Sequence, residues 1–331
     1  MRIYLLRRLA YVIPTLIGVN LLVFALFFLV NTPDDMAREA LGDKASSPEQ
    51  LAHWKASRGY DLPLLWNGGA AGAAKVTRTV LWTKSLSLLW GDLGRSDMTR
   101  ELIGPALRER VMPSLCVSLP VFLATLLLNI VLAMQSARRR GGAFDMNVQL
   151  LCVLLMSVSS LIYIIAGQYA FAKVMRLTPV SGFQPGRDMA LFLALPVVTG
   201  VVSSLGGGVR LYRTLFLEEM GRDYVRTARA KGLSEARILY VHVLRNALIP
   251  IVTNVPLQLL MLMTGNMLLE NFFSIPGLGG YTIGALRSQD FAVVRTMVFL
   301  GSVLYMLGML LSDICYCLAD PRVRLGGGAR P

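Results

Sequence analysis

The side chains best suited to chemistry are few in this sequence, and they form no catalytic or metal-binding pattern. His53 and His242 are far apart, and neither has a ligand companion at the spacing of a metal site. Cys315 and Cys317 have no second pair or histidine near them. No Gly-x-x-x-x-Gly-Lys-Ser/Thr pattern occurs, so the chain carries no phosphate-binding loop of that kind. The sequence therefore predicts no enzyme: no catalytic residue, no metal and no cofactor on this chain.

The segments that must position the remaining polar residues are long and apolar. Of the 331 residues, 54% are hydrophobic and only 16% are charged, whereas soluble proteins carry about 25% charged residues. Six runs are nearly free of charge: 9–30, 111–137, 146–172, 189–209, 246–269 and 296–319. Each run can cross about 30 Å of hydrocarbon as a helix, and none alternates like a barrel strand. The sequence predicts an all-α integral membrane protein with six transmembrane helices.

The net charge is +13, and the positions of the basic residues along the chain indicate the orientation of the helices in the membrane. Basic clusters precede the first run, separate the second from the third and the fourth from the fifth, and follow the sixth. If the helices alternate in direction, all four clusters lie on one side, which is cytoplasmic by the positive-inside rule. We therefore expect both termini in the cytoplasm and no nucleic-acid partner. The first run is longer than a signal-peptide core, so we interpret it as a retained helix.

These runs suggest four parts of the chain. Residues 1–30 form the N-terminus and first helix, and residues 31–110 form an extracytoplasmic, periplasmic cap whose stretch 79–89 could be an amphipathic surface helix. Residues 111–319 form the transmembrane domain with helices 2–6, and residues 320–331 form a cytoplasmic tail. Three glycines at 206–208 are expected to close the fourth helix, because glycine weakens helices.

The cytoplasmic segment between helices 4 and 5, residues 210–245, is the most informative. Residues 228–231 should be helical, Gly232 should break that helix, and Ser234 should cap a second helix from Glu235. The result is a helix–turn–helix hairpin outside the lipid. Such a hairpin suits docking into a groove on a soluble partner, although a basic loop on anionic lipid would carry similar residues.

Polar residues within the apolar runs are candidates for the transport path or for helix–helix contacts. Gln258 and Asn266 are eight residues apart and should share one face of helix 5, so we single them out as candidate pore-lining residues. Asp313 is an acid inside helix 6, where we expect a structural partner rather than a role in a pore.

Several stretches, in order along the chain, resemble the permeases of the dipeptide/oligopeptide/nickel family of ABC importers. The stretch from Asp223 to Ser234, followed by Arg245-Asn-Ala-Leu-Ile-Pro, is similar to that family's coupling loop. Glu270-Asn-Phe-Phe-Ser-Ile-Pro-Gly-Leu-Gly is similar to its helix 5–6 segment, and Asp320-Pro-Arg-Val-Arg to its tail. The N-terminal pattern, with Arg7-Arg8 and Pro14-Thr15, resembles the B-type subunit.

The resemblance implies a permease subunit in a bacterial inner membrane, as a multi-pass protein and one half of a translocation pore. It implies four kinds of partner: a homologous second permease in a heterodimer, two ATPase subunits that bind the ATP, a periplasmic solute-binding protein, and membrane lipid. It also implies an ATPase-coupling interface made of Tyr224, Thr227, Ala228, Lys231, Gly232 and Leu233.

Two other functions fit this sequence less well. A secondary transporter driven by an ion gradient would be expected to show internal repeats and midplane charges, which are not visible here. An intramembrane enzyme would need a catalytic set, yet the predicted spans contain no histidine. Within the importer interpretation, dipeptides, longer peptides, peptide-like antibiotics and nickel chelates all stay open as substrates.

Overall fold

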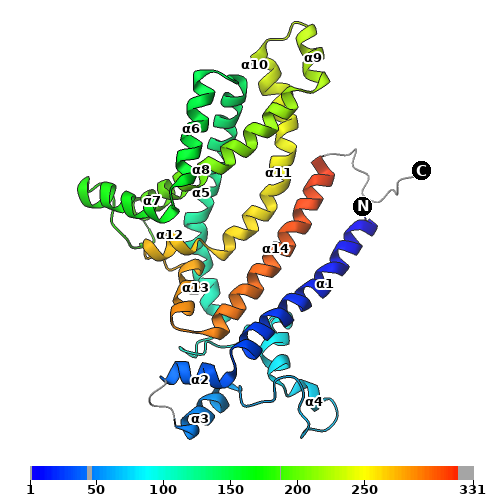
Figure 1. The fold of residues 1–331 in the computed structure, drawn as a ribbon, viewed down its shortest axis with the longest axis vertical. Helices are drawn as coiled ribbons and strands as arrows, with labels where there is room; N and C mark the ends of the chain where they lie inside the picture. The colour runs from blue at the N-terminus through cyan, green and yellow to red at the C-terminus, as the bar shows by residue number, and fades with distance from the viewer. Residues whose placement is uncertain (1, 43–46, 187, 320–331) are drawn as a thin grey trace. The chain divides into compact units, whose positions relative to one another are not determined.

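The computed structural model describes residues 2–42, 47–186 and 188–319, and the chain divides into two compact units. Unit 1 comprises residues 1–110 and 281–307, and unit 2 comprises residues 111–280 and 308–331. Helices dominate both units (Figure 1). Over the described ranges there is no strand, only one isolated bridge between Arg95 and Leu102.

Five helices within the described residues are long and apolar enough to cross a membrane. They are Ala10–Val30, Ile103–Arg138, Met189–Met220, Glu235–Phe272 and Phe291–Leu318. The pair Ala143–Ser157 and Ser160–Val174 makes a sixth candidate if the bent pair is one span. The all-helical class is therefore confirmed, with five or six candidate spans. The tail motif that begins at Asp320 lies outside the described residues.

The third apolar run is not one straight helix, contrary to the sequence prediction. Helix α6 (Ala143–Ser157) ends at Val158, whose backbone is extended, and α7 (Ser160–Gly167) starts after a bend of 91°. The hydroxyl of Ser159 accepts a hydrogen bond from the Leu161 amide at 3.4 Å and so caps α7. Serine caps helices readily because its side chain competes for backbone groups. A π-helical turn, η4 (Gln168–Val174), completes this segment.

Helix α8 (Met189–Met220) passes straight through the three glycines, so the prediction that they end it was wrong. Their small size instead permits close packing within unit 2. A Cβ atom on Gly206 would lie 2.7 Å from the Cys152 carbonyl oxygen on α6, and one on Gly208 would overlap the Asn129 amide on α5 (Ile103–Arg138). Close approach of the backbones outweighs the roughly 1 kcal/mol that glycine costs a helix. Figure 1 shows α6 beside α8.

The fifth apolar run is also broken. It comprises η5 (Ile238–Val243), α11 (Leu244–Met261), a short 3₁₀ turn η6 (Leu262–Thr264) and α12 (Met267–Phe272). Gly265, with φ of +78°, lies between the last two and turns the chain. Gln258 and Asn266 therefore do not share one face of a single helix, because a left-handed residue ends regular helix geometry.

Unit 1 begins with α1 (Arg2–Ala25) and a π-helical turn, η1 (Leu26–Val30). Helices α2 (Pro33–Leu41) and α3 (Pro48–Arg58) each start with a capping box, from Thr32 and Ser47 respectively. A core with several aromatic residues joins these elements: Phe24, Phe28, Met36, Trp54, Tyr60 and Val80. This packing gives the segment after the first helix a defined structure of its own.

The rest of unit 1 consists of short turns and parts of two longer helices. Helix α4 (Ala74–Thr77) is followed by a π-helical turn, η2 (Leu81–Ser85), and a 3₁₀ turn, η3 (Leu86–Trp90), so the amphipathic α-helix predicted over 79–89 does not form. One reason is that Asn20 on α1 donates to the carbonyl of Ser85 at 2.8 Å. Helices α13 (Leu278–Arg287) and α14 (Phe291–Ala319) contribute residues 281–307.

Candidate functional site

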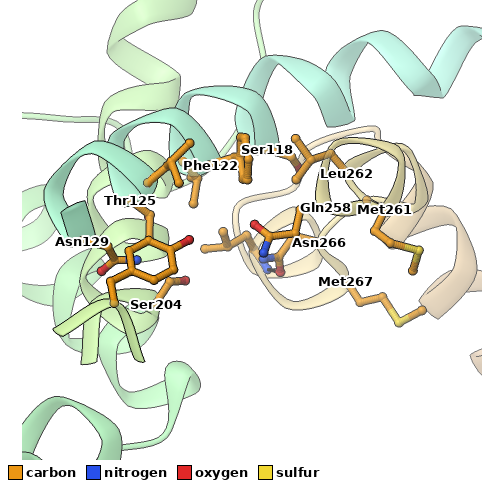
Figure 2. Close-up of a pocket in the computed structure, with 15 residues that line it drawn as sticks. Ser118, Phe122, Thr125, Asn129, Ser204, Gln258, Met261, Leu262, Asn266 and Met267 are labelled. Atoms are coloured by element: carbon orange, nitrogen blue, oxygen red, sulfur yellow. Dashed lines mark hydrogen bonds between the residues drawn. The ribbon is translucent and has the colours of Figure 1, made fainter. Parts of the chain in front are cut away.

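A cavity of unit 2, lined by both polar and apolar side chains, has a volume of about 460 Å³ and contains both candidate pore-lining residues. Figure 2 shows Asn129 and Ser204 toward one side of it and Gln258 and Asn266 toward the other. Further lining residues come from α5, α11, η6 and α12: Ser118, Phe122, Thr125, Met261, Leu262 and Met267. The lining is thus a mixture of amide, hydroxyl and thioether groups.

Several polar atoms in this cavity have no hydrogen-bond partner in the described structure. The hydroxyl of Thr125 and the amide oxygen of Asn129 are buried and unpaired. Gln258, exposed to the cavity, makes no hydrogen bond to another described residue. Unpaired polar groups are costly in an apolar medium, so they mark a space that holds water or a polar solute. The cavity can therefore solvate a small polar molecule inside an apolar bundle.

Asn266 also has a structural role, in addition to lining the cavity. Its side-chain oxygen accepts from the Leu269 amide at 3.1 Å and caps α12. The backbone amide of Asn266 donates to Glu270 Oε1 at 2.9 Å, and the backbone amide of Gly280 donates to Glu270 Oε2 at 3.0 Å. Glu270 is fully buried, so its carboxylate fastens the turn after α12 to the wall of the cavity. Glu270 belongs to the motif that resembles the family's helix 5–6 segment, but the sequence alone gives it no role.

The predicted hairpin between helices 4 and 5 is present as α9 (Asp223–Ala230), a tight turn and α10 (Glu235–Arg237). Gly232 has φ of +77°, which favours glycine, and its amide donates to the Arg229 carbonyl at 2.9 Å. The Ser234 hydroxyl accepts from the Arg237 amide at 3.4 Å, as expected of a helix cap. The predicted break at Gly232 and cap at Ser234 are both confirmed.

A bidentate ion pair closes the turn of this hairpin. Arg229 Nε lies 2.6 Å from one carboxylate oxygen of Glu235, and Arg229 Nη2 lies 3.1 Å from the other. At the start of α9, the Tyr224 hydroxyl donates to Glu219 at 2.9 Å, and partial burial raises the pKa of Tyr224 above its usual range. The hairpin is therefore a preformed element rather than an open loop.

The six predicted coupling residues fall into three groups by exposure. Thr227, Lys231 and Gly232 are exposed, and Tyr224 and Leu233 are half-buried. Ala228 is buried with Val225 against Ile238 and Leu239 in the core of unit 2. Figure 1 shows α9 and α10 together beyond the end of α11. One face of α9 thus anchors the hairpin, and the opposite face is free for a partner.

No group of three or more histidine, cysteine, aspartate or glutamate side chains in the described part of the chain could hold a metal ion. The four cysteines are free, and Cys152 is buried. The site consists of a cavity with polar lining residues and a rigid, exposed hairpin, both within unit 2. Such an arrangement can bind and pass a solute and can receive a mechanical input.

Comparison with known proteins yields matches over most of the chain. Residues 129–325 match the family model of the binding-protein-dependent transport system inner membrane component. The dipeptide transport system permease protein DppB of Escherichia coli K12 is 31% identical over 352 residues, which cover 97% of this chain and 98% of that protein. A di/tripeptide transport system permease protein of Pseudomonas aeruginosa is 32% identical over 348 residues, with the same coverage. A protein of Brucella suis, provisionally named as a peptide transport system permease, is 33% identical over 324 residues, covering 96% of this chain and 98% of its own length.

Proposed function

Because this chain belongs to the family of inner membrane components of binding-protein-dependent transport systems, we propose that it forms one half of an ATP-driven import pore for peptides or peptide-like solutes. The chain is a multi-pass protein of the bacterial inner membrane. The observation that carries the proposal is the polar cavity of about 460 Å³ within unit 2, which also bears the hairpin.

The proposed mechanism assigns a different role to each part of the site. A periplasmic binding protein delivers the solute, and a homologous permease supplies the other half of the pore. Two cytoplasmic ATPase subunits complete the transporter, and this chain binds ATPase through the exposed face of α9 near Thr227 and Gly232. ATP-driven closure of the ATPases moves the hairpin as a rigid body, and the cavity alternates between the two sides of the membrane. This arrangement requires both termini to be cytoplasmic.

Reconstitution tests the proposal directly. Liposomes that contain this chain, its partner permease and both ATPase subunits should take up a labelled dipeptide only when ATP and the binding protein are supplied on the correct sides. A secondary carrier needs neither ATP nor the binding protein. Uptake by this chain alone, driven by a proton or sodium gradient, would overturn the proposal.

Within the cavity, Gln258 and Asn266 should respond differently to substitution. We expect Gln258→Leu to reduce dipeptide uptake about fivefold to tenfold, because a lost hydrogen bond to a polar solute is worth about 1 kcal/mol or slightly more. Its melting temperature should hardly change, since Gln258 has no hydrogen bond to lose among the described residues. Asn266→Ala should lower the melting temperature, because a helix cap contributes about 1 kcal/mol.

Asn254→Leu is the matched control for Gln258→Leu. Asn254 is exposed on the same helix α11, outside the cavity lining, and its amide bonds only to the Pro250 carbonyl at 2.9 Å. Uptake by this variant should stay near the unmodified level. If Asn254→Leu and Gln258→Leu reduced uptake equally, the cavity would not be the path.

A further inference from the structure

A second cavity, in unit 1, has a marked excess of positive charge. It has a volume of about 320 Å³, and its lining includes the basic residues Arg58, Lys84, Arg95, Arg100 and Arg295. Only two acidic residues, Asp92 and Asp97, line it. Nothing in the proposed transport mechanism uses these side chains.

Arg295, on α14, is the deepest of the five cations. It is only 4% exposed, and its Nε and Nη1 atoms have no hydrogen-bond partner in the described structure. No acidic side chain of the described residues forms an ion pair with it, and its guanidinium lies 5.2 Å from the centre of the Phe28 ring. Arg295 interacts with the Tyr60 hydroxyl, but two buried N–H positions of its guanidinium still lack acceptors, which is costly, so the site is incomplete as it stands.

The nearby acidic side chains form hydrogen bonds within the walls of the cavity. One carboxylate oxygen of Asp97 accepts from the Tyr60 hydroxyl at 2.8 Å and from the Ala292 amide at 3.1 Å. Asp290 accepts from the Asp97 amide at 3.0 Å and also from the Ser96 hydroxyl. These bonds join the segment around residue 97 to the start of α14, and Asp97 acts on Arg295 only electrostatically, without forming an ion pair with it.

The other cations around the cavity oppose one another, and the nearby acids, Asp97 above all, offset this only in part. Burial lowers the pKa of Lys84 below its usual value, and the neighbouring Arg295 lowers it further. Burial also lowers the pKa of Arg58, and Arg100 adds to this. Like charges close together in a partly dry space oppose each other's charged forms, and a bound anion would relieve that opposition.

We propose that this cavity binds the carboxylate of a small solute, with Arg295 and Lys84 as its principal ligands. The fork of an arginine matches the two oxygens of a carboxylate. A volume of about 320 Å³ is near the lower end of ligand pockets, which suits a molecule the size of a short peptide. The proposal deepens the proposed function, on which it rests for the nature of the solute.

Binding to the purified full-length chain in detergent tests the proposal without any ATPase or binding protein. The probe is dialanine, compared with dialanine whose C-terminus is an amide. Trp54 serves as the reporter, because its ring lies 4.1 Å from the Arg58 guanidinium and 5.8 Å from the Tyr60 ring. We expect a saturable change of tryptophan fluorescence with dialanine, at least about tenfold weaker binding of the amide, and loss of the signal in Trp54→Phe.

Variants of the two ligands sharpen the test. Arg295→Gln and Lys84→Gln should each weaken dialanine binding about tenfold or more. Arg78→Gln, at an exposed site of unit 1 outside the cavity lining, is the matched control and should bind normally. If Arg295→Gln does not fold, the half-buried Lys84 decides the question.

The proposal would be overturned by no binding of dialanine, by equal binding of the amide, or by unchanged binding in Lys84→Gln. Inorganic phosphate that competes as strongly as acetate would show a general anion site and would also overturn it. Since the assay contains no ATPase, its failure leaves the proposed transport function standing.

Discussion

Replacing Gly232 by arginine is expected to abolish solute-stimulated ATP hydrolysis by the assembled transporter, while the chain itself remains in the membrane. Gly232 is exposed at the turn of the hairpin, and a Cβ atom there would meet no described atom within 4 Å. The variant chain can therefore fold. An arginine forced into the docking interface would leave a desolvated charge without a partner, which costs about 3 kcal/mol or more. That penalty corresponds to a loss of affinity for the ATPase subunits of roughly a hundredfold or more.

The measurement is co-purification of the ATPase subunits with the variant, followed by ATP hydrolysis with and without solute and binding protein. Gly232→Ala provides a graded comparison, because it adds only a methyl group at the same φ of +77°. We expect Gly232→Ala to retain assembly, with a loss of folding stability of about 1–2 kcal/mol from the left-handed backbone.

Gly72→Arg is the matched control for backbone strain. Gly72 has φ of +59°, and a Cβ atom there also meets nothing within 4 Å, but it lies in unit 1 rather than in the hairpin. Both arginine variants therefore carry a similar strain and the same added charge. If Gly72→Arg abolished stimulation as fully as Gly232→Arg, or if Gly232→Arg retained normal stimulation, the hairpin would not be the docking element.

The membrane spans were predictable because the solvent dictates them. Lipid cannot satisfy backbone hydrogen bonds, so a run such as 296–319 must be helical, and α14 covers it completely. The hairpin was predictable for a local reason. A glycine that needs a positive φ and a serine that caps a helix act within a few residues of their own position, as Gly232 and Ser234 do.

Features that depend on distant neighbours were predicted wrongly or not at all. The glycines at 206–208 suggested a helix end, because the sequence does not reveal that the backbone of α6 and the side chain of Asn129 lie against them. The bend before α7 has neither proline nor glycine, and only the capping of Ser159 marks it. The cationic cavity joins residues about 200 positions apart, such as Lys84 and Arg295.

In the candidate site, the right residues were selected for a reason that the structure does not support. Gln258 and Asn266 were selected because their spacing suggested one helix face, and the break at Gly265 removes that reason. Both nevertheless line the cavity, because α12 begins on the same wall at which α11 ends. Thr125 and Asn129, which complete the polar lining from α5, could not be distinguished by sequence from ordinary helix–helix contacts.

Breaking the ion pair between Asp145 and Arg213 should strongly destabilise unit 2. Arg213 Nε and Nη2, on α8, each lie 2.7 Å from a different carboxylate oxygen of Asp145 on α6. The Ser136 hydroxyl and the Gly141 amide also donate to this carboxylate, the latter at 2.9 Å. The two side chains are only 6% and 20% exposed, for the aspartate and the arginine respectively.

We expect Asp145→Ala and Arg213→Met each to reduce the free energy of unfolding by roughly 3–5 kcal/mol, because each leaves a mostly buried charge without its partner. The double variant Asp145→Leu with Arg213→Met should recover most of that loss, because it leaves neither charge. Thermal unfolding of the purified chain in detergent measures all three. Glu218→Gln, which removes an exposed partner of Arg222, should change stability by less than about 1 kcal/mol.

This ion pair bears on transport because of where it lies along α8. Arg213 is on the last two turns of that helix, which lead directly through Gly221 into the hairpin, and Asp145 joins them to the α5–α6 turn. A hairpin that is pushed by an ATPase can move the cavity only if α8 moves with α6 and α5 as one body. The single variants should therefore lose solute-stimulated ATP hydrolysis at temperatures where the chain is still folded, and at the same time keep their ATPase subunits bound. Full stimulation in a folded Arg213→Met variant would show that the hairpin drives the cavity through other contacts.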